Sequence, residues 1–539
     1  NDIRLRLEKH YHDMMDIEFT IQSGKLWMLQ CRVGKRNGPA AIRMASEMVH
    51  EKLIDENTAI GRVTPAQLDE LLHPIVNPEA EKSTKILAKG LPAGPGGATG
   101  KAVFTAQDAV NWAAKGEKVV LVREETNPED VEGMRASVAI LTSRGGMTSH
   151  AALVARGWGM CCIVGAGEIE VDSIKKEFVV NELTIKEGDS ITLNGSVGNV
   201  YEGELDLIKT DMTSDYLSHF LSLCDNVRKL KVRTNAETPA DAKRALSFGA
   251  QGIGLFRIEH MFYGEGSEEP LFHLQKMIMA NNSEERKAAL DSLFPFMKND
   301  IKETLRAMKG LPVTIRLMDP PLHEFIPHDE KRQKQLSDAL DIDSDELSKR
   351  SDALKESNPM MGHRGVRLGI THPEITEMQA RAILEAAAEL ATEKIETFPE
   401  IMVPLTGIET EYTHQEKIIR EVADTIKGLD NYMVGTMIEV PRATIVADRI
   451  AETAEFFSFG TNDLTQMAFG FSRDDTGGFM PAYLENKLLP EDPFASLDEG
   501  VCELVRIGIE KGRKTRPKLK VGICGEHGGE PKSVHFCHN

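Results

Sequence analysis

The chain has 539 residues, more than one hydrophobic core can organise, and this length predicts roughly three domains. Apolar residues make up 41% of the chain, and no apolar run is long enough to cross a bilayer, so we expect no membrane partner. The net charge of −20, without a basic block, argues against a nucleic-acid partner, and an anionic substrate would need local arginines or a metal ion.

The first segment, residues 1–35, contains "DIEFTIQSGKLWMLQCR", whose alternating pattern predicts two strands joined by a turn at Ser23–Gly24. Two strands cannot build a core, so we expect this segment to be the remnant of a larger domain. Residues 36–88 have a helical period and a helix start at Thr64–Pro65, and they predict a helical linker.

Residues 89–204 open with the Gly/Pro-rich "KGLPAGPGGATG" and continue with short apolar runs that predict a compact α/β domain. Its end, "EGDSITLNGSVGNVYEGEL", predicts a hairpin that turns at Asn194–Gly195. The helical linker precedes this domain and a charged linker, residues 205–229, follows it. Because both flanks are connectors, we expect the domain to move as a rigid unit.

Within that domain, "RGGMTSHAALVARGWG" places His150 at the mouth of a helix. The free N–H groups and the positive dipole end there disfavour an imidazolium and favour an anion, so we expect a neutral, nucleophilic histidine. A phosphoryl group on His150 could be held by the Thr148 and Ser149 hydroxyls. The alternative is that Thr148 or Ser149 simply caps a helix and His150 is a surface residue; the motif alone leaves both interpretations open.

Residues 230–539 repeat a strand, a loop and a helix, which predicts a (β/α)8-type barrel. Seven strands are recognisable, in "LKVRTNAE", "GIGLFRIEHMF", "PVTIRLMD", "EIMVPLTG", "YMVGTMIEVP", "FFSFGTNDL" and "KVGICGEHGG". The chain stops in the seventh helix, so we expect the last β/α unit to be missing. The predicted fold class is therefore an α/β multidomain protein, in which an α/β domain carrying His150 precedes a C-terminally truncated barrel.

Polar residues follow five of these strands, at the end where barrels carry their chemistry: Arg257, Arg316, Asp319, Glu439, Asn462, Asp463 and Cys524. Carboxylate oxygens suit Mg²⁺ or Mn²⁺, guanidinium groups grip phosphate or carboxylate, and a thiol can transfer a proton. A metal ion, an anion clamp and a proton donor together fit an enolate intermediate. A buried cysteine with only a packing role is the alternative for the thiol.

Several long motifs resemble one family: "GGMTSHAALVARGWG", "GLFRIEHMF", "IRLMDPPLHEF", "NPMMGHRGVRLGI", "GTMIEVPRA", "FGTNDLTQMAFGFSRDD" and "GICGEHGGEP". The chain resembles, over essentially its whole length, the pyruvate, phosphate dikinase family of phosphoenolpyruvate-utilising enzymes. The resemblance implies interconversion of ATP, phosphate and pyruvate with AMP, pyrophosphate and phosphoenolpyruvate. In that family a swivelling domain carries a phosphohistidine between an ATP-grasp domain and a barrel that binds pyruvate.

The resemblance implies a role for each matching position. His150 would be the phosphohistidine, Cys524 the acid/base for the pyruvate methyl group, and Thr148 the regulatory phosphorylation site of plant members. Glu439 and Asp463 would bind Mg²⁺, the one cofactor expected. The substrate-binding set would be Arg257, Arg316, Glu439, Gly460, Thr461, Asn462 and Asp463, with Ser458 and Arg364 along the same pocket.

In the first segment, Glu18, Gln30 and Arg32 match the family's nucleotide-site residues, with Asp16 nearby. The body of the nucleotide domain is not present in this sequence, so residues 1–35 would be an ATP-grasp remnant that cannot bind ATP alone. The expected partners of the whole enzyme are pyruvate and phosphoenolpyruvate, ATP and AMP, phosphate and pyrophosphate, and a second copy in a homodimer.

Three alternatives remain. Phosphoenolpyruvate synthase uses water in place of phosphate, but usually has Cys before the carrier histidine, where this chain has Ser149. Enzyme I of the sugar phosphotransferase system shares the barrel but has a different N-terminal arrangement. A non-catalytic fragment that only binds phosphoenolpyruvate is disfavoured because the metal ligands are intact. Should Cys524 not be the acid/base, His527 is the nearest candidate.

The seven cysteines are scattered and odd in number, which indicates free thiols in a reducing compartment. The polar residues 1–12 do not resemble a secretory signal. We therefore expect a cytoplasmic protein, or one in an organelle such as a glycosome or plastid.

Overall fold

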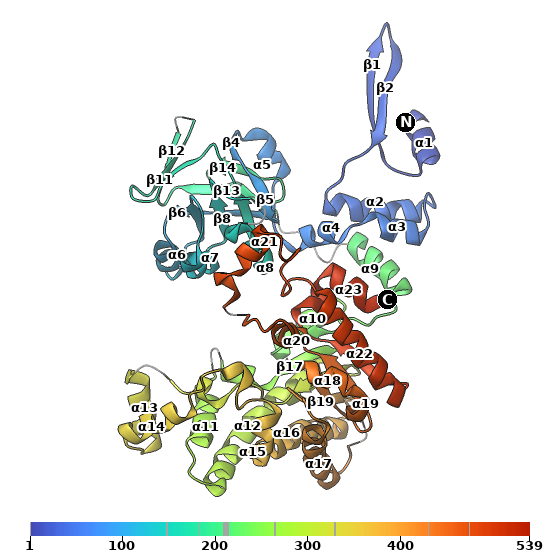
Figure 1. Cartoon of the computed structure of the whole chain (residues 1–539). Coiled ribbons are helices and arrows are strands. Elements are labelled where there is room, and N and C mark those ends of the chain that lie inside the picture. The colour runs from blue at the N-terminus through green and yellow to red at the C-terminus, as the bar shows by residue number, and fades with distance from the viewer. Residues whose placement is uncertain are drawn as a thin grey trace. The chain divides into compact units, whose positions relative to one another are not determined.

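The computed structural model describes residues 2–146, 149–181, 183–208, 215–263, 266–327, 330–429, 431–473 and 475–539. The chain divides into two compact units, each with its own hydrophobic clusters (Figure 1). Unit 1 comprises Asn1–Lys229 and Thr476–Pro490, and unit 2 comprises Leu230–Asp475 and Glu491–Asn539. In the described segments, no helix combines the length and the apolar character that crossing a bilayer requires.

Unit 1 begins with helix α1 (Asp2–Tyr11) and an antiparallel hairpin of β1 (Met15–Gln22) and β2 (Lys25–Val33). The turn is at Ser23 and Gly24, whose φ angles of 51° and 71° allow the tight two-residue turn that matches strand twist. The hairpin predicted from the alternating pattern is confirmed.

Helices flank the α/β part of unit 1 on both sides. Before it come α2 (Gly38–His50), α3 (Glu56–Arg62), α4 (Pro65–Asp69) and α5 (Pro78–Ser83), and after it comes α9 (Asp215–Val227). Helix α4 begins with a capping box between Thr64 and Gln67, which confirms the predicted helix start. Phe220 of α9 packs in one cluster with Ile42 of α2, so the two connectors meet.

The α/β part is an eight-stranded sheet in the order β4-β14-β13-β6-β7-β8-β9-β5. Its strands are β4 (Ile86–Lys89), β5 (Leu91–Gly94), β6 (Gly97–Val103), β7 (Val119–Arg123), β8 (Ala139–Thr142), β9 (Cys161–Val164), β13 (Ser190–Asn194) and β14 (Asn199–Glu202). Strands β6 to β9 run parallel, joined by α6 (Ala106–Ala113), α7 (Val131–Ala136) and α8 (His150–Trp158). Two short sheets accompany it, one of β10 (Glu170–Asp172), β11 (Glu177–Val180) and β12 (Leu183–Lys186), the other of β3 (Ile75–Val76) and β15 (Leu207–Ile208).

The predicted turn at Asn194–Gly195 is wrong, although the hairpin itself is present. Asn194 is the last residue of β13 and pairs with Asn199, so the connection is the four residues 195–198, with Gly198 at φ 81°. Gly195 lies against another strand: a Cβ there would be 2.0 Å from the Gly94 carbonyl oxygen. A close approach of two backbones, and not a two-residue turn, requires this glycine.

Unit 2 is built on a seven-stranded parallel sheet whose strands follow one another in chain order. They are β16 (Thr234–Asn235), β17 (Ile253–Arg257), β18 (Pro312–Arg316), β19 (Phe398–Val403), β20 (Met433–Ile438), β21 (Phe456–Phe459) and β22 (Lys520–Ile523). This sequential order of parallel strands confirms the predicted barrel-type α/β fold.

Helices cover the outside of this sheet. They are α10 (Pro239–Ser247), α11 (Glu268–Ile278), α12 (Ser283–Ala307), α15 (Val366–Thr371), α16 (Pro373–Thr392), α17 (Glu409–Thr425), α18 (Pro441–Ile445), α19 (Ala447–Ile450), α20 (Thr461–Phe469), α22 (Glu499–Thr515) and α23 (Pro531–His538). Two more, α13 (Glu330–Leu340) and α14 (Ser344–Leu354), lie in the long connection after β18.

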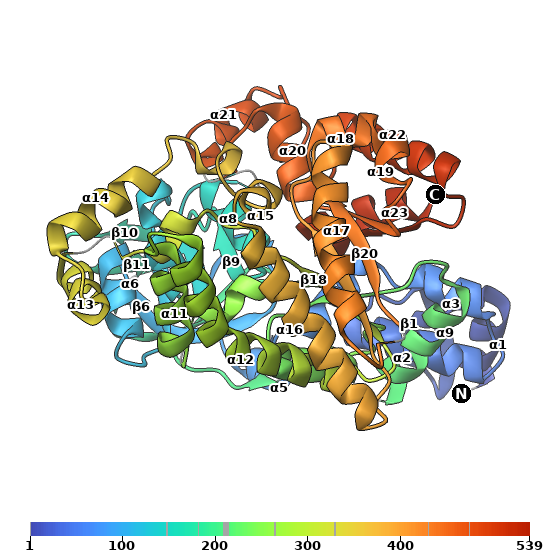
Figure 2. The same cartoon turned by 90° about the horizontal axis from the view of Figure 1, so that it is seen from below.

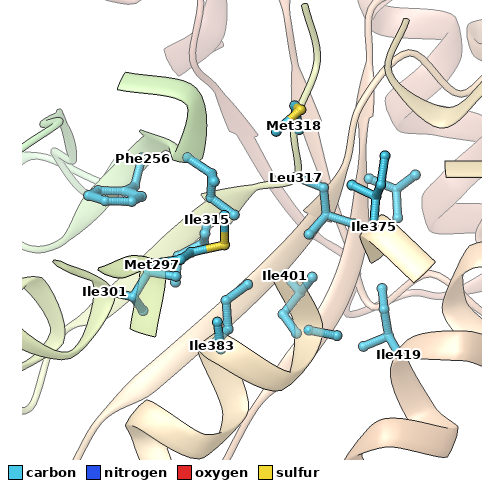
Figure 3. Packing of buried hydrophobic residues seen from close by; sticks show 14 of the residues in the cluster. Phe256, Met297, Ile301, Ile315, Leu317, Met318, Ile375, Ile383, Ile401 and Ile419 are labelled. Atoms are coloured by element: carbon cyan, nitrogen blue, oxygen red, sulfur yellow. The ribbon is translucent and has the colours of Figure 1, made fainter. Parts of the chain in front are cut away.

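The core of unit 2 lies between the sheet and its longest helices. Figure 3 shows Met297 of α12 beside Ile315 of β18, and Ile383 of α16 near Ile401 of β19. Helices α12 and α16 run side by side (Figure 2), and Lys298 Nζ of α12 lies 2.8 Å from Glu389 Oε1 of α16. This packing fixes the strands whose carboxyl ends carry the polar residues.

Candidate active site

The polar residues at the strand ends of unit 2 surround one cavity of about 240 Å³. The residues around it include seven that the sequence singled out: Arg257, Arg316, Glu439, Gly460, Asn462, Asp463 and Cys524. Asp319 and Arg364 line it as well. Thr461 and Ser458 are buried beside these residues. The sequence-predicted barrel residues are thus gathered in one place.

Carboxylates hold the first two arginines of the cavity. Arg257 is paired with Glu237, and Arg316 is paired with Glu259 and lies 3.1 Å from Asp319 Oδ2. Burial acts to lower the pKa of Arg316, but Glu259 and Asp319 outweigh it, so the pKa is raised and the guanidinium stays charged. Both guanidinium groups are therefore held in place by carboxylates before any substrate binds.

Arg364 is a third arginine of the cavity, and it contacts two of the cavity's carboxylates, Asp319 and Asp463. Its Nη2 donates to Asp319 Oδ2 at 2.6 Å and to Asp463 Oδ2 at 2.8 Å. Burial alone would raise the pKa of Asp319, but Arg316 and Arg364 outweigh it and lower the pKa. Asp319 consequently stays ionised and orients two arginines at once.

Glu439 and Asp463 are two carboxylates of the cavity that could hold a cation. Glu439 Oε1 accepts a hydrogen bond of 2.6 Å from Leu405 N, and a Cβ at Gly460 would lie only 2.7 Å from Glu439 Oε2. Burial first, and then Asp463 and Asp319, raise the pKa of Glu439 to about 8. A bound cation would relieve this crowding of negative charge.

The donor set fits Mg²⁺ and not a structural zinc ion. The described residues contain no group of three or more His, Cys, Asp or Glu side chains arranged for a metal ion. Proteins usually bind Mg²⁺ through one or two carboxylates together with water and substrate oxygens, which matches the pair Glu439 and Asp463. A zinc site would need three or four protein ligands.

The thiol of Cys524 is buried at the edge of the cavity. Burial raises its pKa to about 11, despite a hydrogen bond with Ser458 that lowers it, so the thiol carries its proton at neutral pH. Its backbone N–H donates to Phe459 O at 3.1 Å, and its carbonyl accepts from Asn235 Nδ2 at 3.1 Å. The site therefore contains a protonated thiol, and the N–H and the carbonyl of the same residue are both hydrogen-bonded.

His527, the alternative acid/base, is fully buried and engaged on both sides. Its Nε2 lies 2.8 Å from Pro493 O, which can only accept, so Nε2 carries the proton and Nδ1 accepts from the Thr461 hydroxyl at 2.8 Å. Burial lowers the pKa of His527, which keeps it neutral. His527 thus orients Thr461 and does not line the cavity.

In unit 1, His150 is the first residue of α8, as the motif predicted. Its Nδ1 lies 3.0 Å from Thr126 Oγ1, and burial lowers its pKa against the opposing effect of Asp130. The lowered pKa favours the neutral imidazole, and Nδ1 is hydrogen-bonded to Thr126. Ser149 Oγ accepts from Ala152 N at 3.4 Å, so a cap is also present, while Thr148 lies outside the described residues.

Glu18, Gln30 and Arg32 lie on the β1–β2 hairpin, where Glu18 pairs with Gln30 in the ladder. Arg32 Nε lies 3.0 Å from Asp16 Oδ2, and Arg32 Nη2 lies 3.5 Å from Glu18 Oε1. These side chains are half exposed and share one face of the hairpin. The structure brings these side chains together on the hairpin.

Sequence reasoning missed several polar residues of the site. Glu237 and Glu259 also follow strands, so the strand-end rule could have found them. Arg473 lines the cavity and pairs with Glu526, and Gln466 Oε1 accepts from Arg473 N at 2.9 Å. Nothing in the spacing marks Arg473, because it follows the end of a helix and not of a strand.

Three family models match the chain. The model described as PEP-utilising enzyme, PEP-binding domain matches residues 212–539, and the model described as PEP-utilising enzyme, mobile domain matches residues 115–198. The model of the pyruvate phosphate dikinase AMP/ATP-binding domain matches residues 1–53.

Curated relatives are similar over nearly the whole chain. Pyruvate, phosphate dikinase 1, chloroplastic, of Oryza sativa subsp. japonica is 54% identical over 98% of this chain and 56% of its own length. Pyruvate, phosphate dikinase of Clostridium symbiosum is 50% identical over 100% of this chain and 62% of its own length. The chain thus spans little more than half the length of these relatives. On these matches, the chain belongs to the family of PEP-utilising enzymes.

Proposed function

We propose that the chain carries the phosphoenolpyruvate half of a pyruvate, phosphate dikinase reaction. What supports this most directly is the cavity that gathers guanidinium groups, three carboxylates and a protonated Cys524 thiol. The test is to incubate the chain with phosphoenolpyruvate and Mg²⁺ and measure its mass. The expected result is the addition of one phosphoryl group at His150, with release of pyruvate. An unchanged mass would contradict the proposal.

In the proposed step, His150 Nε2 attacks the phosphorus of phosphoenolpyruvate. The N–P bond forms, the P–O bond breaks, and its electron pair stays on the oxygen as the enolate of pyruvate. The Cys524 thiol then gives its proton to C3, and the thiolate takes a proton back from water. Arg257 and Arg316 bind the anionic groups, because both are held as cations by their carboxylates. The reverse sequence makes phosphoenolpyruvate.

Glu439 and Asp463 would hold the Mg²⁺ ion in this site. When bound, the ion supplies positive charge that stabilises the enolate oxygen and the phosphoryl oxygens. Gly460 keeps the space beside Glu439 open, and Arg364 fixes Asp463 in place. Thr461 and Asn462 complete the substrate-binding set that we propose.

Substitution of the two carboxylates should remove the metal site and leave the fold intact. We expect the Glu439→Gln, Asp463→Asn double variant to lose Mn²⁺ affinity at least ~10-fold, since both charged ligands are gone. Electron paramagnetic resonance titration of free Mn²⁺ measures this. The control is Glu421→Gln, an exposed carboxylate on α17. Unchanged Mn²⁺ affinity in the double variant would remove Glu439 and Asp463 from the site.

Thr126 is expected to set the reactive nitrogen of His150. If Nδ1–H donates to Thr126 Oγ1, the lone pair is on Nε2, where the phosphoryl group is taken up. Thr126→Val keeps the shape but removes the acceptor, so phosphorylation of His150 by phosphoenolpyruvate should slow by up to about 10-fold. Single-turnover mass measurements test this, with the exposed Thr184→Val as the control. Equal rates in both variants would show that Thr126 does not orient His150.

For the chain's domains we propose the division that the sequence predicted. Residues 1–35 belong to a nucleotide-binding domain with Glu18, Gln30 and Arg32, 36–88 and 205–229 are linkers, 89–204 swivel, and 230–539 bind phosphoenolpyruvate or pyruvate. Swivelling is required because phosphoryl transfer needs reacting atoms within ~3–3.5 Å, and His150 serves two sites. We further propose that ATP and AMP, and phosphate and pyrophosphate, are the remaining reactants. The enzyme would act as a homodimer.

We place the enzyme in the cytoplasm or in an organelle such as a plastid, because its seven cysteines are free. Regulation by phosphorylation of Thr148 is proposed from its place two residues before the carrier histidine.

A further inference from the structure

A hydrogen bond joins the first and the seventh strands of unit 2 at the proposed proton donor. Asn235 Nδ2 donates to the carbonyl oxygen of Cys524 at 3.1 Å, across 289 residues of sequence. Asn235 is the last residue of β16, and Cys524 directly follows β22. These two strands are the outermost strands of the seven-stranded sheet. The hydrogen bond therefore connects the two edges of the sheet.

The bonded carbonyl belongs to the peptide between Cys524 and Gly525, so the bond fixes one side of the backbone from which the Cys524 thiol projects. On the opposite side of Cys524, its N–H donates to Phe459 O at 3.1 Å. Gly525 lies tightly against Thr461, since a Cβ on Gly525 would be 2.0 Å from Thr461 Oγ1. A small rotation of this peptide would therefore move the thiol and press Gly525 against its neighbour.

We infer that Asn235 is a positioning residue that holds the Cys524 thiol in place for proton transfer to C3. Asn235 does not line the cavity, so it acts through the Cys524 peptide and not on the substrate. This inference rests on the proposed function, which gives the thiol its role. It gives the proposed proton donor a side-chain contact from the first strand of the sheet.

The first experiment follows exchange of the pyruvate methyl protons in D₂O with Mg²⁺ by proton NMR. Asn235→Asp has the same shape but no donor, and we expect kcat for exchange to fall about 10- to 100-fold, because small misplacements of reacting groups cost this much. KM for pyruvate should stay unchanged, since Arg257 and Arg316 are untouched. Asn235→His, whose Nδ1–H can occupy the position of the amide nitrogen, should recover part of kcat.

The matched control is Gln275→Ala. Gln275 Nε2 donates to Phe325 O at 2.9 Å, so this change also deletes one amide-to-carbonyl bond that joins two segments of unit 2. A merely structural role for Asn235 predicts that both variants have the same kcat as the unsubstituted chain. The positioning role predicts a loss of kcat in Asn235→Asp alone.

A second experiment needs no turnover. The rate of Cys524 alkylation by iodoacetamide, followed by peptide mass spectrometry, reports how often the buried thiol becomes accessible. Loss of one hydrogen bond should raise this rate about 3- to 10-fold in Asn235→Asp and leave it unchanged in Gln275→Ala.

The outcomes separate the two proposals. If the unsubstituted chain exchanges methyl protons and Asn235→Asp keeps its kcat, the role of Asn235 is overturned and the proposed function stands. If the unsubstituted chain neither exchanges protons nor accepts phosphate at His150, the proposed function fails. In that case, equal rates of Cys524 alkylation in all variants would also refute the inference that Asn235 holds Cys524 in place. Faster alkylation in Asn235→Asp alone would support that inference.

Discussion

The Cys524→Ala variant is expected to lose exchange of the pyruvate methyl protons about 10²- to 10⁴-fold, the usual contribution of a general acid or base. The thiol is buried and protonated beside the cavity, and His527 cannot replace it because both of its ring nitrogens are engaged. Proton NMR in D₂O measures the rate. Binding of phosphoenolpyruvate should persist, since the arginines remain.

The control is Cys502→Ala, a half-buried cysteine on α22 whose loss should leave exchange unchanged. Near-normal exchange in Cys524→Ala would remove the thiol from the chemistry. Because His527 does not face the cavity, the proton would then have to come from a water molecule.

The His150→Ala variant is expected to show the complementary loss. No phosphoryl group should be retained after incubation with phosphoenolpyruvate and Mg²⁺, because the only proposed acceptor atom is gone. Exchange of the pyruvate methyl protons should persist in part, because the Cys524 site lies in the other unit. Mass measurement and proton NMR on the same sample test both halves.

Here the control is His219→Ala, an exposed histidine on α9 that has no role in the proposal. If the His150→Ala chain were phosphorylated at another residue as fast as the unsubstituted chain, that residue and not His150 of α8 would be the phosphoryl carrier. Loss of both activities together would indicate that the variant is misfolded, which its melting temperature would reveal.

The repeat of strands and helices in unit 2 could be predicted from the sequence because its central strands, β18 to β21, are apolar and buried over most of their residues. Runs such as "EIMVPLTG" and "YMVGTMIEVP" became β19 and β20 almost as predicted. The hairpin of β1 and β2 was equally clear, since its alternation and its Ser23–Gly24 turn are local. Local patterns therefore recovered the elements and their order.

The prediction of a turn at Asn194–Gly195 was wrong because of a contact with a strand outside the hairpin. Asn-Gly normally indicates a two-residue turn, but here Gly195 is needed because another strand's Gly94 carbonyl approaches it. No pattern within the hairpin contains that information.

In the candidate site, too, the sequence predicted some of the residues but not the contacts between them. The strand-end rule found Arg257, Arg316 and Asp463 because barrels place chemistry there. It could not show that Asp319 and Arg364 link them, or that Asn235 reaches Cys524, because those contacts depend on side chains from distant strands.

The 289 residues between Asn235 and Cys524 also have a consequence for how the site comes into being. Contacts of such large sequence separation form late in folding, because the intervening chain must be ordered before they repay the entropy of closing the loop. The cavity is lined by residues from segments spread between residues 255 and 525, so no single segment contains the whole site. Unit 1 itself includes residues 476–490, so during synthesis it is not complete until the strands up to β21 have been made. The hydrogen bond of Asn235 with Cys524 can form only once β22 has joined the sheet that β16 begins.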